Sequence, residues 1–332
     1  MADKNYPKDD KLRALHHFVP QSYLRRFAID GKPDQIYAYE LDKEPYPSNV
    51  KNVAAQRDLY TYTEQSTGDE NAALENVFAE IDDKGANLLH KLDSMPDGYF
   101  TLPEKEQADL LTYIAYLHTR NIQERKHRAT SMGQMSLVYL KTLASNKDKF
   151  HQDTFKVFGE KYDQEKIEQT RLSVLDDKFE IEYDYMDQHF LGDTLSITKD
   201  LYLILMERKQ AVLVSTKGTS KVFVTSDNPV THYGLPEQKA LGLGYINAIF
   251  QIPITPTRCI LLINKNMEMS TFDYGGNDVD HINFFTYYYA DRWIFSNIKS
   301  KRISQMFKDH RATKPHTRIS SPFNRKTKDD EL

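Results

Sequence analysis

The fold class of this chain of 332 residues is decided by one stretch, AVLVSTKGTSKVFVT, which covers residues 211–225. Both ends of the stretch are apolar and rich in β-branched residues, and Lys217-Gly218 between them is a turn pair. This pattern favours two strands joined by a turn. The sequence therefore predicts one strand over Ala211–Ser215 and another over Val222–Thr225.

The hydrophobic period differs on the two sides of this stretch. Upstream, apolar residues recur three and four positions apart, as on one face of a helix. The expected helices cover 71–92, a segment from Thr101 or Pro103 to Arg128 or Leu143, 150–175, 182–206, 279–295 and 298–309. The other expected strands cover 35–41, 58–62, 248–254 and 258–264. The predicted fold class is α+β, with a long helical middle between a small N-terminal β element and a C-terminal antiparallel β region.

The composition is that of a globular protein, with 39% hydrophobic and 28% charged residues and a net charge of −4. This balance excludes disorder over most of the chain and a general polyanion binder, although a local basic patch can still bind phosphates. No run of about 18 apolar residues exists, and the N-terminus lacks the apolar segment of a secretory signal. We predict a cytoplasmic protein with no membrane segment, a mobile N-terminus over 1–13, a single α+β domain over 14–312 and a flexible basic-then-acidic tail over 313–332.

The single cysteine, Cys259, excludes an intrachain disulfide and argues against a cysteine-based zinc site. It lies beside the apolar run Ile260–Ile263, where a buried, inert thiol is expected. The eleven histidines include no His-x-x-x-His pair, and the chain has no Walker loop and no complete dinucleotide-binding loop. The sequence therefore predicts neither a metal nor a cofactor.

The first stretch that could carry chemistry is HHFVPQSYLRRF, residues 16–27. Its proline favours a helix start, and His17, Gln21 and Arg25 or Arg26 then gather near the first turn. His16, directly before them, is a further candidate ligand-binding residue. Histidine and arginine at a helix N-terminus suit an anion such as phosphate. The alternative is that the two histidines cap or pack this turn.

This stretch also carries a resemblance to a known family. Its pattern His-x-Val-Pro-Gln-x-Tyr-Leu-x-x-Phe resembles the opening of the bacterial family called domain of unknown function 4238. Further segments fit that family in order: Ile36–Tyr39, Asp58–Thr61, Glu75, Arg120, Phe223–Val230 and Ile252–Pro256. The resemblance covers most of residues 15–300. It implies a shared fold and says little about activity, since the family is named for having no known function.

The second stretch is Thr225-Ser226-Asp227-Asn228-Pro229, where a predicted strand ends in polar residues. Polar groups at strand ends are common in catalysis. Asp227 could orient a histidine such as His17 or take part in a metal site, and Ser226 could donate a hydroxyl proton. The alternative is a turn in which Asp227 and Asn228 bind backbone N–H groups.

The third stretch is Arg120-Asn121-Ile122-Gln123-Glu124-Arg125-Lys126-His127. Two helical turns separate Arg120 from His127, so both lie on one face, with Glu124 between them. The spacing resembles the Arg-x(4–6)-His motif of HEPN ribonucleases. That resemblance implies metal-independent RNA cleavage, with the histidine as general acid or base and the arginine stabilising phosphorane charge. HEPN domains are all-helical, unlike this chain, and the alternative is an exposed charged helix end.

Together these stretches favour a phosphodiester-cleaving or phosphate-recognising protein. A metal-independent endoribonuclease is the leading interpretation, with RNA or a phosphorylated small molecule as partner. Two alternatives remain open, a non-enzymatic interaction or scaffold protein and a hydrolase of a small phosphorylated ligand. If the three stretches form one site, His17, Gln21, Arg120 and Asp227 should line one pocket.

Overall fold

The computed structural model describes residues 15–57, 59, 62–63, 70–71, 73–176, 181, 187–234, 248–267 and 276–312. These residues form two compact units. The larger unit holds the described residues up to Glu124 and from Asp187 onward, and the smaller unit holds those within 125–181. This division falls inside the span 14–312 predicted as a single domain. The predicted mobile N-terminus, the tail and most of the strand at 58–62 lie outside the described residues.

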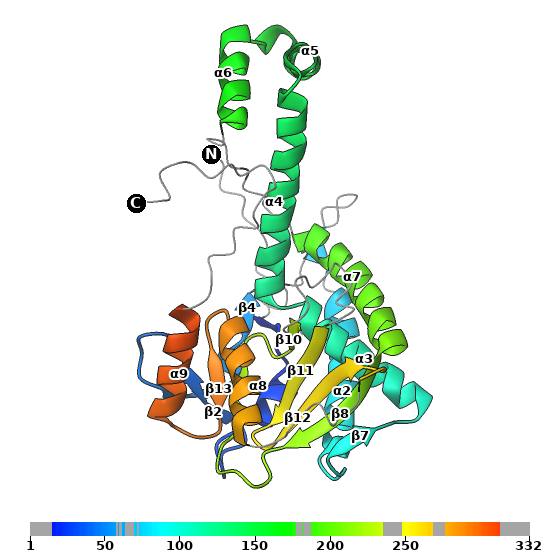
Figure 1. The fold of residues 1–332 in the computed structure, drawn as a ribbon, viewed down its shortest axis with the longest axis vertical. Coiled ribbons are helices and arrows are strands. Elements are labelled where there is room, and N and C mark those ends of the chain that lie inside the picture. Colours follow the sequence, from blue (N-terminus) through cyan, green and yellow to red (C-terminus); the bar gives the residue numbers. More distant parts are fainter. Residues whose placement is uncertain are drawn as a thin grey trace. The chain divides into compact units, whose positions relative to one another are not determined.

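The main sheet of the larger unit has five antiparallel strands in the order β10-β11-β12-β8-β7 (Figure 1). Their bounds are β7 Gly98–Phe100, β8 Lys209–Ser215, β10 Thr231–Gly234, β11 Ala248–Thr255 and β12 Arg258–Asn264. Every side chain from Ala248 to Ile254 is buried, which explains why all of these residues except Gln251 are apolar. The predicted α+β class with its antiparallel C-terminal region is confirmed, and so are the three strands at 211–215, 248–254 and 258–264.

A second sheet joins the two ends of the chain in the order β3-β2-β13-β9. Its strands are β2 Gln35–Tyr39, β3 Tyr46–Asn49, β9 Thr225–Ser226 and β13 Ile294–Ser296. Two-stranded ladders complete the β structure: β1 Leu15–His17 with β4 Ala55–Arg57, and β5 Tyr62–Thr63 with β6 Glu70–Asn71. The predicted strand over Val222–Thr225 is wrong except at Thr225. The N–H of Phe223 binds the Pro256 carbonyl and that of Val224 binds the Asn283 side chain, so neither joins a ladder.

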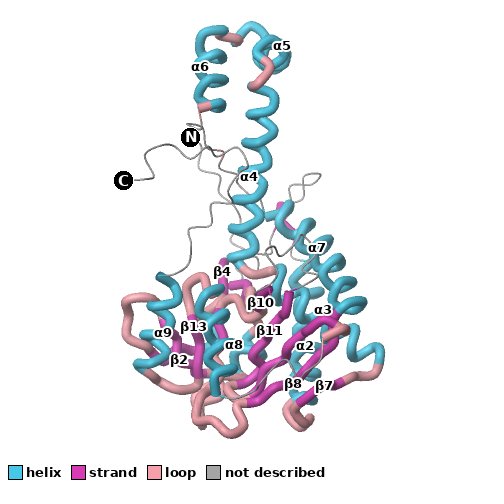
Figure 2. The backbone as a smooth tube through the Cα atoms, in the orientation of Figure 1, coloured by secondary structure: helices cyan, strands magenta, loops and turns pink. Residues whose placement is uncertain are grey.

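The helices of the larger unit are α1 Gln21–Arg25, α2 Ala73–Leu92, α3 Glu104–Thr119, α7 Asp187–Arg208, α8 Gly276–Tyr289 and α9 Lys301–Ala312, and the single-turn η1 Val50–Asn52. Helix α4, Ile122–Ala144, spans the division between the units. The smaller unit adds α5 Lys147–Phe158, η2 Gly159–Lys161 and α6 Gln164–Leu175 (Figure 2).

Three predicted helices differ in the structure, and one of them, expected over 150–175, is divided into α5 and α6. The helix expected from Thr101 begins after Pro103 and is broken into α3 and α4 at Arg120-Asn121. The helix expected to run to Phe295 ends at Tyr289. At the break between α3 and α4 and after the end of α8, a polar side chain binds backbone N–H groups that a continuous helix would have used. The side chain is the neighbouring Asn121 in the first place and the distant Asp227 in the second.

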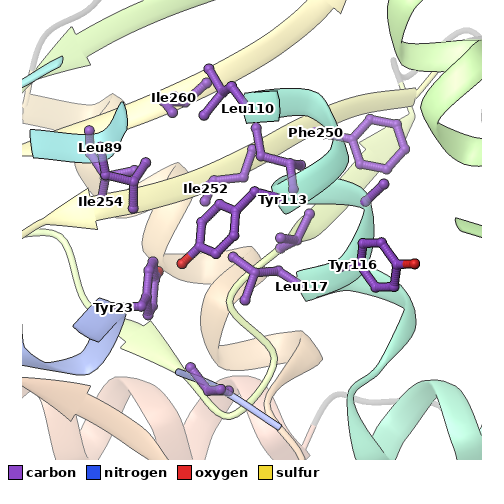
Figure 3. Close-up of a cluster of buried hydrophobic side chains, with 14 of the residues drawn as sticks. Tyr23, Leu89, Leu110, Tyr113, Tyr116, Leu117, Phe250, Ile252, Ile254 and Ile260 are labelled. Atoms are coloured by element: carbon purple, nitrogen blue, oxygen red, sulfur yellow. The ribbon is translucent and has the colours of Figure 1, made fainter. Parts of the chain in front are cut away.

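The core of the larger unit lies between α3 and the main sheet. Figure 3 shows Tyr113 of α3 beside Ile252 of β11, with its hydroxyl end directed toward Tyr23, in the same cluster as Leu117 and Ile254. Helix α2 packs on α3 at Gly85, where an added Cβ would lie 2.3 Å from the Tyr113 ring. Glycine is therefore required there by the close approach of the two helices.

Candidate functional site

Polar side chains from several elements meet at the place where α3 gives way to α4. We call this set the junction. Its members are His118, Asn121, Glu124, Asn228, His232 and Tyr289. They come from α3 and α4, from the turn after β9, from β10 and from the end of α8, and all of them belong to the larger unit.

The centre of the junction is a hydrogen bond between two buried asparagines. Asn121 Nδ2 donates to Asn228 Oδ1 at 3.1 Å and to the His118 carbonyl at 2.5 Å. Asn121 Oδ1 accepts from the N–H of Glu124 at 2.9 Å and so caps the start of α4. Asn228 Nδ2 in turn donates to Gln123 Oε1 at 3.1 Å. The second and third polar stretches of the sequence are therefore joined directly.

A histidine and a carboxylate lie beside this bond. His118 Nε2 is 4.0 Å from Glu124 Oε1, and their side chains are 3% and 16% exposed. The other ring nitrogen, His118 Nδ1, lies 3.3 Å from the Val230 carbonyl. Because Nδ1 donates to that carbonyl, a second proton on the ring can only lie at Nε2, facing the carboxylate. The 4.0 Å separation is an ion-pair distance and is longer than a hydrogen bond.

Two further rings extend the junction. The His232 ring centroid is 5.5 Å from that of His118 and 5.2 Å from that of Tyr289. Burial, and to a smaller degree the charges of Tyr288 and Glu124, raise the pKa of Tyr289 to about 12. The Tyr289 hydroxyl therefore stays protonated and can donate a hydrogen bond.

Arg120 lies next to the junction but is held by another partner. Its guanidinium binds both oxygens of Asp82 on α2, at 2.7 and 3.2 Å, and lies 5.7 Å from the Phe78 ring centroid. The side chain is only 1% exposed. Burial raises the pKa of Asp82, and Arg120 opposes that shift. This fork geometry fixes α2 to the end of α3.

Asp227 is also occupied by the protein itself. Its carboxylate accepts the N–H groups of Asp291, Arg292 and Trp293 at 2.7–3.0 Å. Burial raises its pKa to about 6, although these three bonds lower it. Ser226 accepts the Asn228 N–H at 3.0 Å and donates to the Asn228 carbonyl at 2.8 Å. The turn thus has the backbone-binding arrangement that was the alternative to catalysis.

The predicted residues of the first stretch have partners of their own. His16 is buried on β1, and His17 Nε2 lies 3.2 Å from the Lys51 carbonyl, with its pKa lowered by burial. Arg25 binds Asp34 at 2.7 Å and Gln21 at 3.3 Å near the surface.

A tyrosine connects this stretch to the rest of the molecule. The Tyr23 hydroxyl lies 2.8 Å from Thr225 Oγ1, directly before the second stretch, and donates to the Pro253 carbonyl at 2.5 Å. The three stretches thus meet in a chain of contacts through Tyr23, Thr225 and the junction. That His17, Gln21, Arg120 and Asp227 line one pocket stays a prediction.

His127 lies on an exposed part of α4 in the smaller unit. The residues that sequence reasoning missed are His118, His232, Tyr289 and Asp82. A signal for His118 was present, since it directly follows the buried run Ile114–Leu117 and precedes a predicted site residue. His232 carried no comparable signal, while Tyr289 belongs to the tyrosine run 287–289, whose helical spacing favoured a core position over a binding one.

Three other structural observations bear on the site. Among the described residues, no three of His, Cys, Asp and Glu gather closely enough to hold a metal ion. None of the helices within the described ranges has the length and apolar character needed to cross a membrane. An open cleft of about 600 Å³ is lined by Pro96, Asp97, Ser215, Thr216, Lys217, Thr257 and Arg258, none of which is a predicted site residue. Cys259 is buried, as predicted.

Comparison with known proteins gives one match. The model of a family described as "Protein of unknown function (DUF4238)" matches residues 15–300. No curated protein and no solved structure matches the chain. The match spans all three polar stretches and every residue of the junction.

Proposed function

Because the chain belongs to the DUF4238 family, whose description names no activity, we propose a function from its geometry. The function is cleavage of phosphodiester bonds in RNA by general acid–base catalysis at the junction. A phosphoester substrate agrees with the abundance of Arg, His and Gln in the polar stretches, and RNA supplies its own nucleophile, the 2′-hydroxyl.

The observation that carries this proposal is the pairing of Glu124 with His118. Glu124 is the more accessible of the two, and His118 lies behind it at an ion-pair distance of 4.0 Å. Catalytic contacts of this length often shorten to hydrogen bonds when the substrate binds. In the proposed reaction Glu124 accepts the proton of the 2′-hydroxyl, and His118 stabilises that proton on the pair. The 2′-oxygen then forms a bond to phosphorus while the bond from phosphorus to the 5′-oxygen breaks.

The leaving 5′-oxygen needs a proton, and Tyr289 is the donor that the junction offers. Its raised pKa keeps the hydroxyl protonated. The N-terminal turn of α4, which begins at Ile122, contributes backbone dipoles that favour an anion such as the phosphorane. The products are a 2′,3′-cyclic phosphate and a free 5′-hydroxyl.

The test decides whether RNA cleavage depends on the Glu124–His118 pair or on Arg120 with His127. Labelled single-stranded RNA is incubated with the purified protein in EDTA, and the products are analysed for a 2′,3′-cyclic phosphate. Glu124→Gln, which keeps size and partial exposure, should lower the cleavage rate by about 10²–10⁴-fold. His127→Ala is the matched control and should leave the rate unchanged.

Three results of this experiment would contradict the proposal. Loss of cleavage in His127→Ala but not in Glu124→Gln would assign the chemistry to Arg120 and His127 and overturn the junction proposal. Absence of any cleavage would remove the nuclease proposal altogether. Cleavage that EDTA abolishes would contradict a reaction carried by protein side chains alone.

A further inference from the structure

The smaller unit exposes more apolar surface than its size explains. Eight of the sixteen large apolar side chains exposed among the described residues lie between Met132 and Leu175. The buried core of the same region consists of Ala144, Phe150 and Val174, with three half-buried side chains around it. A core this small provides little stability by itself. Apolar surface left uncovered in such a unit marks an interaction site.

One helix carries this surface in an ordered form. On α4, the side chains of Met132, Met135 and Tyr139 are 38%, 68% and 66% exposed. Their spacing of three and four positions places them on one face, and we call them the α4 stripe. The segment ATSMGQMSLVYL, residues 129–140, contains no charged residue although 28% of the chain is charged.

We propose that the α4 stripe is the docking site for a second copy of this chain. Electrostatics argue against partners that are bound mainly through charge. RNA or an acidic membrane surface is bound through lysine and arginine, and residues 129–140 hold neither. An uncharged face has no repulsion to overcome when it meets an identical face.

The stripe is also complementary to itself in shape and chemistry. Its spacing is that of the a and d positions of a coiled coil, which seat a facing helix. When two copies pair antiparallel about a twofold axis, Met132 of one helix faces Tyr139 of the other, and Met135 lies near the axis. A methionine sulfur against an aromatic ring is a favourable contact, and the symmetry makes it twice.

The first test measures the oligomeric state of the full chain by light scattering or sedimentation, at concentrations up to about 100 µM. We expect a reversible dimer. Tyr139→Glu should raise the dimer dissociation constant by about tenfold or more, because it introduces two buried charges. Leu203→Glu, at a 44% exposed apolar position on α7 in the larger unit, is the matched control and should leave the dimer intact.

The second test reads the geometry of the pairing. Met132→Lys should also dissociate the dimer, whereas the double variant Met132→Lys with Tyr139→Glu should restore it, because the new charges then face each other. Met135→Cys should form an intermolecular disulfide under mild oxidation, since the only native cysteine, Cys259, is fully buried.

A chain that stays monomeric over this range overturns the proposal. A dimer that Tyr139→Glu does not weaken overturns it as well, because its interface must lie elsewhere. A monomer that binds neutral phosphatidylcholine vesicles, and loses that binding in Tyr139→Glu, would assign the stripe to a lipid surface instead.

Discussion

Arg120 and His127 lie in one charged stretch of sequence, yet their surroundings are opposite. Arg120 is 1% exposed and bound to both oxygens of Asp82, while His127 is exposed on α4. The residues between them change from buried to exposed within one helical turn. A motif that places an arginine and a histidine on one helix face therefore does not ensure a shared environment. The burial of each side chain has to be known before a common role is assigned.

The largest expected effect comes from breaking the buried pair. Asp82→Ala leaves the Arg120 guanidinium buried without its carboxylate, and we expect a loss of about 3–5 kcal/mol in the free energy of unfolding. Urea denaturation followed by circular dichroism measures this loss. Asp83→Ala removes the exposed neighbouring carboxylate and should cost under about 0.5 kcal/mol. Equal effects of the two substitutions would show that the Arg120 pair adds nothing.

The second largest effect is the pH dependence of stability that the buried Asp227 produces. Burial raises the pKa of Asp227 from 3.8 to about 6, so the folded protein binds this proton more tightly than the unfolded chain. The stability from this group is complete below pH 3.8 and is lost as the pH rises through 6. Two pKa units correspond to about 3 kcal/mol.

The measurement for Asp227 is a difference between two proteins. Free energies of unfolding are determined from pH 3.5 to 7 for the unaltered protein and for Asp227→Asn, which cannot titrate. The advantage of the unaltered protein over the variant should shrink as the pH rises. A constant difference would mean that Asp227 has the same pKa in the folded protein as in the unfolded chain, because the three N–H donors offset the effect of burial.

A smaller effect separates a buried helix cap from an exposed one. Asn121 caps α4 and binds Asn228, whereas Asn146 caps α5 at an exposed position by accepting the Lys149 N–H. Asn146→Ala should cost about 1 kcal/mol. Asn121→Ala should cost about 1–3 kcal/mol more, because it also leaves the buried Asn228 oxygen without its donor. Identical costs in thermal unfolding would refute a structural role for the asparagine pair.

The smallest effect on stability is expected at His127, which is exposed on α4. His127→Ala should change the free energy of unfolding by less than about 0.5 kcal/mol, as is usual for exposed positions. A loss above about 1 kcal/mol, measured by the same denaturation, would mean that His127 makes a contact that its exposure does not indicate.

The sequence was sufficient to predict the elements whose pattern is local. Strands β8, β11 and β12 follow from mostly apolar runs, and the presence of a C-terminal β region follows from the change of hydrophobic period after Arg208. The end of α8 at Tyr289 could not be predicted in this way. It depends on the Asp227 carboxylate, which comes from a distant part of the sequence and binds the backbone of residues 291–293.

The sequence was sufficient to predict which stretches contribute to the candidate site, but not which residues of those stretches face each other. The sequence indicated that polar groups end the apolar elements, and Asn121 and Asn228 do meet. It could not indicate which polar residues face each other, because this depends on the rotation of α3 and on the register of β10 against β11. His118 and His232 have neighbouring rings through exactly that placement, without any shared sequence motif.

The second sheet has a consequence for how the chain folds during its synthesis. Strand β2, Gln35–Tyr39, pairs with β13, Ile294–Ser296, so nearly the whole described chain is translated between the two partners. Until β13 emerges, the edge of β2 that it will cover presents unpaired N–H and C=O groups. Contacts this distant in sequence form slowly, because a long loop must close before they add stability. On the ribosome, the β2–β3 hairpin is therefore the segment most exposed to pairing with another nascent chain.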